Sequence, residues 1–124
     1  MTYNEFNEFC GCLAVTSHVV LWGGAHVWKV GGKVFAIGGW ERKQGAAVTF
    51  KTSEQNYYFL SHKQGYCPAP YFANRGMKWI QRYDLSSDLS TIEKEELFYY
   101  LKESYRIVYL GLTKKKQKEL GLNC

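Results

Sequence analysis

Basic side chains and aromatic rings are the groups in this sequence with the clearest chemistry. Between Ala14 and Tyr83 the chain has nine lysines and arginines, opposed only by Glu41 and Glu54, for a net charge of +7. The next stretch, from 84 to 110, has six acids against three bases, and the whole chain carries +5. A basic region beside an acidic one favours an anionic partner such as nucleic acid. The alternative is ordinary solubilising charge.

Catalytic chemistry has little support in the sequence. His18, His26 and His62 have no nucleophile motif beside them, and the G-x-S-x-G, H-E-x-x-H and phosphate-loop patterns are absent. The glycine pairs at 23–24, 31–32 and 38–39 precede no helix start, so they are typical of turns rather than of a phosphate cradle. We therefore predict that the protein is not an enzyme and that it uses no cofactor.

Cysteine usage and composition predict a cytoplasmic protein with reduced thiols. No segment has the roughly 18 apolar residues that span a bilayer, and the acidic start MTYNEFNEF does not resemble a secretory signal. The cysteines are Cys10, Cys12, Cys67 and Cys124. A zinc site is not expected, because C-x-C in a helix directs its two thiols to different faces and no CxxC motif follows. An iron site of the frataxin kind is also not expected, since the first helix offers only Glu5 and Glu8.

The clearest structural signal is a hairpin over Ala25 to Gly39, with Gly31-Gly32 between two runs of β-branched and aromatic residues. Before it, a T-x-x-E capping box at Thr2 predicts a helix to about Leu13. The segment from 14 to 21 is predicted to be a loop or an extended connection.

Further strands and helices follow the hairpin. We predict a strand over Ala46–Lys51 and a helix over Glu54–Lys63, capped by Thr52 with Gln55. The residues of this helix expected to face inward are Tyr58, Phe59 and either His62 or Leu60. Two prolines keep the stretch 66–71 at a sheet edge, Asn74-Arg75-Gly76 reads as a turn, and 77–83 reads as the last long strand.

The C-terminal part is predicted to be helical. Ser90 and Glu93 form another capping box, and apolar spacing continues to Leu110, where Gly111 ends the helix. The lysine-rich segment after Thr113 is either a short helix or a fraying tail. At 124 residues, the chain is one domain (1–124) with a basic tail from about 111.

Three motifs together resemble one family. They are W-G-x-x-H-V-W-K-V-G-G-K-V-F-A from Trp22, Y-x-x-N-R-G-x-x-W from Tyr71, and E-S-Y-R-I-V-x-x-G-L-T-K-K-K-Q-K-E-L from Glu103. In order and spacing the chain resembles the YjbR/MmcQ family. The resemblance implies an α+β fold of the CyaY-like (frataxin-like) kind, with an antiparallel sheet covered on one face by helices.

The resemblance also implies a candidate site. The family is commonly labelled DNA-binding, and the resemblance places six cations on or beside the sheet: Lys29, Lys33, Lys51, Arg75, Lys78 and Arg82. They are interleaved with the rings of Trp28, Tyr71 and Trp79. The alternative is that Trp28 and Trp79 are core rings and that the lysines only solvate one face of the sheet. We expect a small binding module for DNA or RNA, monomeric and with no membrane role, in which the hairpin acts as a wing. The alternative is a protein- or small-ligand-binding groove around Tyr71 and Trp79.

Overall fold

The computed structural model describes residues 1–39, 45–72, 75–85 and 88–121. Its strands form one antiparallel sheet in the order β1-β2-β3-β4-β6-β5. The elements are α1 (Tyr3–Gly11), β1 (Thr16–Leu21), β2 (Ala25–Val30), β3 (Lys33–Gly38), β4 (Val48–Lys51), α2 (Glu54–Ser61), β5 (Tyr66–Pro68), β6 (Trp79–Arg82), α3 (Thr91–Leu110) and α4 (Lys114–Glu119). Asn74 of the predicted Asn74-Arg75-Gly76 turn lies outside the described residues.

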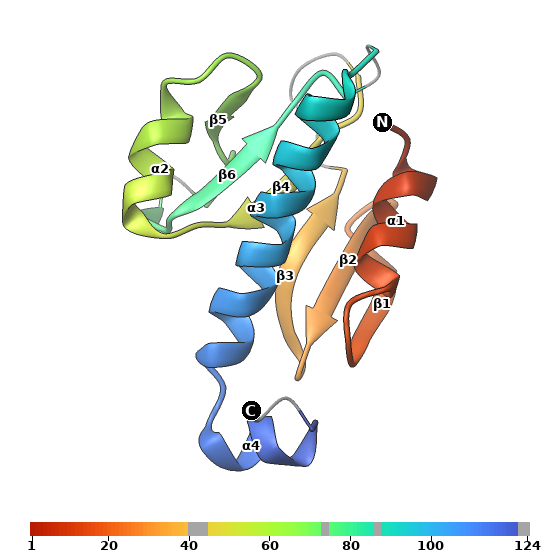
Figure 1. Cartoon of the computed structure of the whole chain (residues 1–124), viewed down its shortest axis with the longest axis vertical. Coiled ribbons are helices and arrows are strands. Elements are labelled where there is room, and N and C mark those ends of the chain that lie inside the picture. The colour runs from red at the N-terminus through yellow and green to blue at the C-terminus, as the bar shows by residue number, and fades with distance from the viewer. Residues whose placement is uncertain (40–44, 73–74, 86–87, 122–124) are drawn as a thin grey trace.

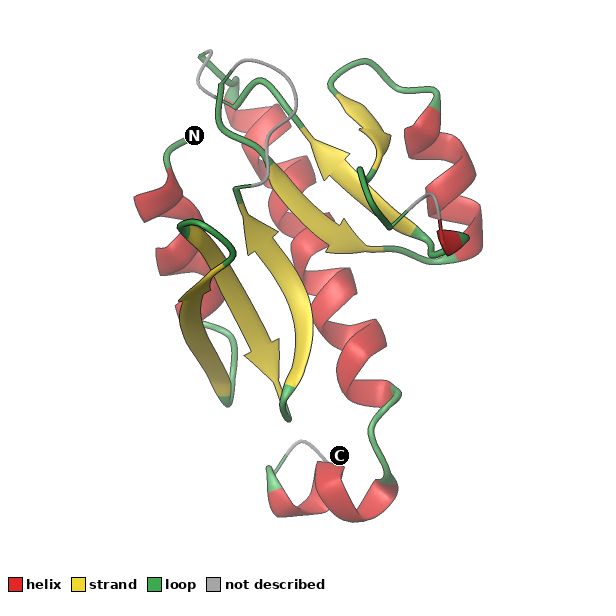
Figure 2. Ribbon diagram, turned by 180° about the vertical axis from the view of Figure 1, so that it is seen from behind, coloured by secondary structure: helices red, strands yellow, loops and turns green. Residues whose placement is uncertain are grey.

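The helices cover one face of the sheet. Figure 1 shows α1 and α3 in front of the strands, and in Figure 2, from behind, the strands stand in front of them. Two of the three predicted capping boxes are present, at Thr2–Glu5 and Ser90–Glu93, so two side chains at each of these helix starts satisfy free backbone N–H groups. The core on this face unites side chains from α1, α2, α3 and the strands: Phe6, Phe35, Phe50, Leu60, Ile80, Leu97 and Leu101.

The segment before the hairpin, predicted to be a loop or an extended connection, is extended over Thr16–Leu21 and forms the edge strand β1, which was not predicted. It pairs with β2 over six residues, from Thr16 opposite Val30 to Leu21 opposite Ala25. Most of its side chains are exposed, because β1 has no strand on its outer side. The apolar alternation that marks a half-buried strand is therefore missing from its sequence.

The α2 prediction needs two corrections. Its N-cap is Ser53, whose hydroxyl accepts from the Asn56 N–H, while Thr52 is buried and its hydroxyl donates to the Lys78 carbonyl. Leu60 is the buried residue of α2, whereas Tyr58 and Phe59 are more than half exposed. Eight residues make only two turns, and one apolar anchor is enough to hold them against β5 and β6.

Strand β6 has no clear alternation because both of its faces are buried. Ile80 joins the core under the helices, whereas Trp79 lies against Phe72, which folds over the other face. On that face the amide of Gln81 donates to the Thr49 hydroxyl across the sheet. A strand covered on both sides loses the period-two pattern.

The sheet forks between β3 and β4, and Ser104 of α3 fills the fork. The two strands pair only between 36–38 and 48–50. Beyond that point the Ser104 hydroxyl donates to the Phe35 carbonyl at 2.6 Å and accepts from the Lys51 N–H at 2.9 Å. Figure 2 shows β4 and β6 turned away from β2 and β3 below their junction. This fork creates the groove described next.

Candidate binding groove on the open sheet face

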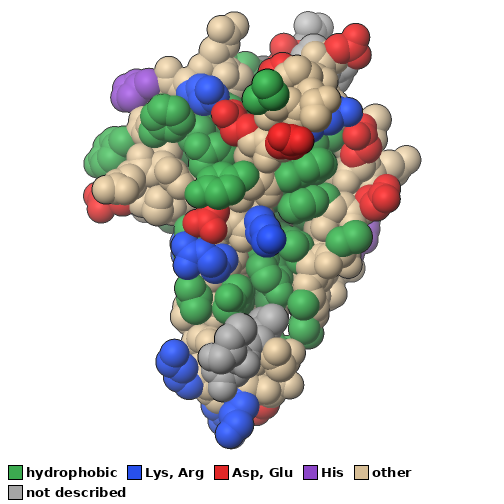
Figure 3. All heavy atoms as spheres, in the orientation of Figure 1, with side chains coloured by type: hydrophobic (Ala, Val, Ile, Leu, Met, Phe, Trp, Pro, Cys, Tyr) green, Lys and Arg blue, Asp and Glu red, His purple; other side chains and the backbone are tan. Residues whose placement is uncertain are grey.

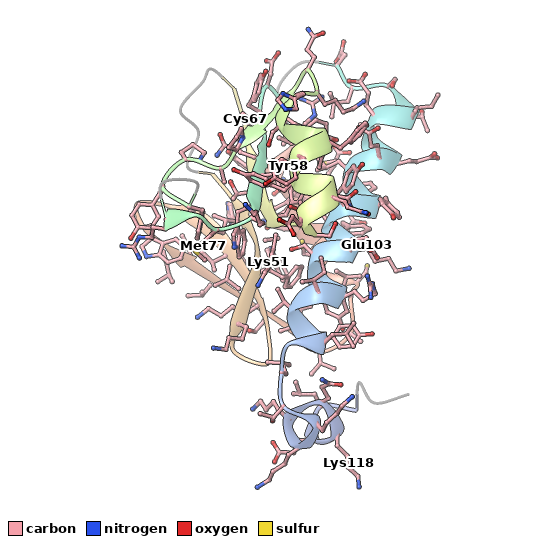
Figure 4. The ribbon with its side chains drawn as sticks, turned by 90° about the vertical axis from the view of Figure 1, so that its left-hand side faces the viewer. Lys51, Tyr58, Cys67, Met77, Glu103 and Lys118 are labelled. Carbon is pink, nitrogen blue, oxygen red and sulfur yellow. The ribbon has the colours of Figure 1, made fainter. Side chains whose placement is uncertain are left out.

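A groove of about 470 Å³ lies where the sheet forks. Its residues come from both halves of the sheet and from the end of α3: Trp22, Lys33, Val34, Ile37, Lys51, Tyr71, Phe72, Met77, Trp79, Ile107, Val108 and Gly111. In Figure 4, Met77 lies on the side of the sheet away from α3, with Lys51 between them. The groove therefore opens on the face that helices α1 and α3 leave free.

One wall of the groove is built from stacked rings. Phe72 stacks on Trp79 with ring centroids 4.7 Å apart and planes 14° from parallel. Tyr71 meets Phe72 edge-on at 5.8 Å and stays 50% exposed. Hydrogen bonds from Ala69 N to Trp79 O and from Met77 N to Phe72 O fold this segment back onto β6. The inner rings are thus fixed, and the outer ring faces solvent.

Two of the groove's residues hold strained backbone conformations. Tyr71 has φ +75° and Trp22 has φ +51°, in the left-handed region that residues with a Cβ rarely adopt. Each such residue costs on the order of 1–3 kcal/mol, and such residues gather at functional sites. Both rings are about half exposed to solvent.

The cationic side chains of the groove come from opposite sides of the fork. Lys33 is exposed at the start of β3, and Lys51 is half-buried at the end of β4. Arg75 is not a lining residue, but it holds its guanidinium 4.7 Å from the centroid of the ring of Tyr71, which is one; this cation–π contact orients both groups. The described lining of the groove contains no Asp or Glu. The charged side chains of its lining therefore give the groove a positive electrostatic potential.

The other predicted cations do not line the groove. Lys29 is half-buried in β2, and Lys78 lies over the rings of Tyr57 and Tyr58 on α2. The prediction that Arg82 belongs to the candidate site was wrong. It is only 6% exposed, pairs with Glu93 at 3.3 Å and donates to the Gly65 and Tyr83 carbonyls. Neighbouring β6 residues alternate faces, so Arg82 lies under the helices and not on the open face.

Of the three predicted rings, Tyr71 and Trp79 line the groove and Trp28 does not. Trp28 is 8% exposed on the helix-covered face, where its indole N–H donates to Asn7 Oδ1 at 2.9 Å and its ring stacks on His18. The sequence interpretation missed Trp22, Phe72 and Met77. Phe72 follows Tyr71 directly, and Trp22 precedes a glycine pair, but neither pattern shows that these segments fold over the sheet.

The β2–β3 turn is not the free wing that the sequence suggested. Gly31 has φ +58°, and a Cβ there would lie 2.5 Å from Leu112 and 3.2 Å from Leu120. These leucines flank α4, which is held by the buried Gln117 donating to the Leu110 and Leu112 carbonyls. The tail is therefore a docked helix. Figure 3 shows Lys and Arg side chains at the end of the molecule that α4 forms.

The fold and groove define an α+β domain with a forked antiparallel sheet. A family model described as YjbR matches residues 13–107. The chain belongs to the YjbR family.

Two solved structures show the same fold. A Deinococcus radiodurans protein, DR2400, with a DUF419 domain, has a TM-score of 0.77 at 22% identity, covering 97% of this chain and 88% of that one. A Pseudomonas syringae protein has a TM-score of 0.67 at 16% identity, covering 86% of this chain and 98% of that one. No curated protein matches the chain. These matches confirm the α+β, YjbR-type sheet, while the frataxin-like label stays a prediction.

The described residues show neither a membrane-spanning helix nor a metal-binding group. None of the helices in the described ranges is long and apolar enough to cross a membrane. Among the same residues, no group of three or more His, Cys, Asp or Glu side chains is placed to hold a metal ion.

Proposed function

We propose that this protein is a cytoplasmic binding module that takes single-stranded nucleic acid into the groove. The proposal rests on one observation: half-exposed rings and cations meet in a groove whose described lining has no carboxylate. Trp22 and Tyr71 stack on bases, while Lys33, Lys51 and Arg75 contact phosphates. This pairing of stacking platforms with a positive track is how proteins bind single strands.

A single strand suits the groove better than a duplex. Stacking needs bases whose faces are free, and bases in a duplex are already stacked on one another. A winged mode of duplex binding needs a free hairpin tip, and here Leu112 and Leu120 pack against Gly31. The groove therefore supports a strand that lays one or two bases against the exposed rings.

The first experiment measures anisotropy of a labelled 12-nucleotide single strand, as DNA and as RNA, at about 50 and 200 mM salt. Affinity should fall steeply with salt, because neutralising phosphates releases counterions. The double variant Lys33→Glu/Lys51→Glu should lose roughly tenfold or more in affinity. Lys114→Glu/Lys115→Glu makes the same change of charge on α4, away from the groove, and should lose much less.

The second experiment tests stacking with matched tyrosines. Tyr71 and Tyr58 are 50% and 55% exposed, but only Tyr71 lines the groove. Tyr71→Ala should weaken strand binding by about 1–3 kcal/mol, and Tyr58→Ala should leave it unchanged. The proposal would be refuted if the two lysine double variants lost the same affinity, or if the parent did not bind the strand at low salt.

A second candidate is a small anionic ligand with an aromatic ring. It is favoured by the apolar inner part of the groove, where Trp79 and Phe72 stack and Ile107 and Val108 contribute from α3. A mononucleotide distinguishes the two functions. If it binds as tightly as the 12-nucleotide strand, the groove is a small-ligand pocket; if affinity grows with length, it is a strand-binding track.

A further inference from the structure

A second polar cluster lies on the other face of the sheet, where α1 crosses β1 and β2. His18 Nε2 lies 3.1 Å from His26 Nδ1, and the two rings stack at 5.3 Å with planes 16° apart. Asn7 Nδ2 lies 3.4 Å from the same His26 nitrogen. The two histidines come from neighbouring strands, and the described groove contains neither of them.

The hydrogen bonds assign the protons of this cluster. The indole N–H of Trp28 donates to Asn7 Oδ1, so the Asn7 amide turns its NH₂ toward His26. An amide NH₂ can only donate, and His26 Nδ1 must therefore accept, which puts the His26 proton on Nε2. The Nε2 of His18 then carries its own proton toward the same acceptor. Two donors thus converge on one lone pair of His26.

The distance between the two nitrogens also matches the distance between two nitrogen ligands of one metal ion. Two imidazole nitrogens, each about 2.0–2.1 Å from one ion at right or tetrahedral angles, lie roughly 2.8–3.4 Å apart. The observed 3.1 Å falls in this range. His18 is exposed, so an ion can reach the pair from solvent.

We propose that His18 Nε2 and His26 Nδ1 together chelate one divalent transition-metal ion of the class that prefers imidazole, such as Ni²⁺, Cu²⁺ or Zn²⁺. To bind it, His18 moves its proton from Nε2 to Nδ1, and its exposed ring turns so that both lone pairs converge on the ion. In this step the proton stays on the His18 ring and only changes nitrogen. Asn7 gives up its acceptor and donates to water. Solvent or a ligand from outside fills the remaining coordination positions.

The structure sets the expected strength of this site. Two imidazoles are fewer protein ligands than the four of a closed structural zinc site, and no third His, Cys, Asp or Glu is grouped with them among the described residues. Binding should therefore be reversible and leave open positions on the ion. Mg²⁺ and Ca²⁺ should not bind, because these ions prefer oxygen ligands.

The test is calorimetric titration of the full chain with Ni²⁺. Ni²⁺ should bind one ion per chain, and His18→Ala should abolish this binding while the melting temperature stays close to that of the parent. Two controls address other ligands: His62→Ala removes the third histidine, and Cys12→Ser removes an exposed thiol near α1. Both should bind Ni²⁺ as the parent does.

A further variant distinguishes metal chelation by the two histidines from a hydrogen bond that only stabilises the fold. Asn7→Ala removes one of the two donors that compete for the His26 lone pair, so it should bind Ni²⁺ at least as well as the parent. If the pair is only a hydrogen-bonded element, none of these variants will change Ni²⁺ binding. Unchanged binding in His18→Ala, or loss of binding in His62→Ala or Cys12→Ser, would overturn the proposal.

Discussion

The two faces of the sheet use the same kinds of residue for opposite purposes. On the helix-covered face, Trp28 and Arg82 are buried and their polar atoms have partners within the chain. On the open face, Trp22 and Tyr71 are half exposed, and neither Lys33 nor Lys51 forms an ion pair with a described carboxylate. A basic or aromatic residue in the sequence thus becomes part of the core or of the groove according to the face of the sheet on which the fold places its side chain.

Ser104 gives the largest expected effect, because it links α3 to both strands of the fork. Ser104→Ala leaves the Lys51 N–H and the Phe35 carbonyl without their buried partner, and should lower the free energy of unfolding by about 3 kcal/mol. It should also weaken strand binding, since the fork shapes the groove. Urea titration and anisotropy measure the two effects. A loss of stability with unchanged binding would show that the groove does not depend on this contact.

Arg82 and Lys51 test the comparison of the faces directly. Arg82→Ala should lower stability by about 2 kcal/mol, because the Gly65 and Tyr83 carbonyls lose a charged donor, and should leave strand affinity unchanged. Lys51→Ala should instead lower strand affinity and leave stability nearly unchanged. Thermal denaturation and anisotropy on both variants check this. The comparison fails if Arg82→Ala alters affinity as much as Lys51→Ala does.

Gly31 and Gly32 form a matched pair for the docking of α4. Both have positive φ, but only at Gly31 would a Cβ meet other atoms, those of Leu112 and Leu120. Alanine at either position should cost about 1 kcal/mol of backbone strain. Gly31→Ala should cost about 1 kcal/mol more for displaced packing. Equal melting temperatures of the two variants would mean that α4 contributes nothing to the hairpin.

Tyr66 on the covered face gives the smallest effect. Burial raises the pKa of its phenol, and the hydrogen bond to Glu96 raises it further. An acid whose folded pKa is raised contributes stability that is complete below its unfolded pKa of about 10 and is lost above it. The melting temperature should therefore fall as pH rises past about 10, and Tyr66→Phe should flatten that fall. If the melting temperature of Tyr66→Phe falls with pH as steeply as that of the parent, the loss of stability at alkaline pH comes from other groups.

Local signals in the sequence predicted the fold well. The capping boxes at Thr2 and Ser90 and the Gly31-Gly32 hairpin depend on neighbours within a few residues, and the structure confirms them. The edge strand β1 was missed because its partner β2 defines it, not its own pattern. Local patterns also could not show which face of α2 is buried, because that depends on where β5 and β6 lie.

The candidate groove was only partly predictable. Tyr71, Trp79, Lys33 and Lys51 were singled out and line it, because rings and cations are visible in the sequence. Trp28 and Arg82 were placed wrongly, since the face of each depends on strand register. Trp22 and Ile107 were missed, because they reach the groove only through the fork between β3 and β4 and the path of α3 along it.

The contact of Leu112 and Leu120 with Gly31 has a consequence for how the chain matures during synthesis. The hairpin leaves the ribosome early, with its strands able to pair at once, whereas the residues that seal its tip are made some eighty positions later. Until then the tip is open to solvent, proteases and other nascent chains. The tip can be closed only after α4 has been made, and protease resistance of the tip would report when this closure occurs.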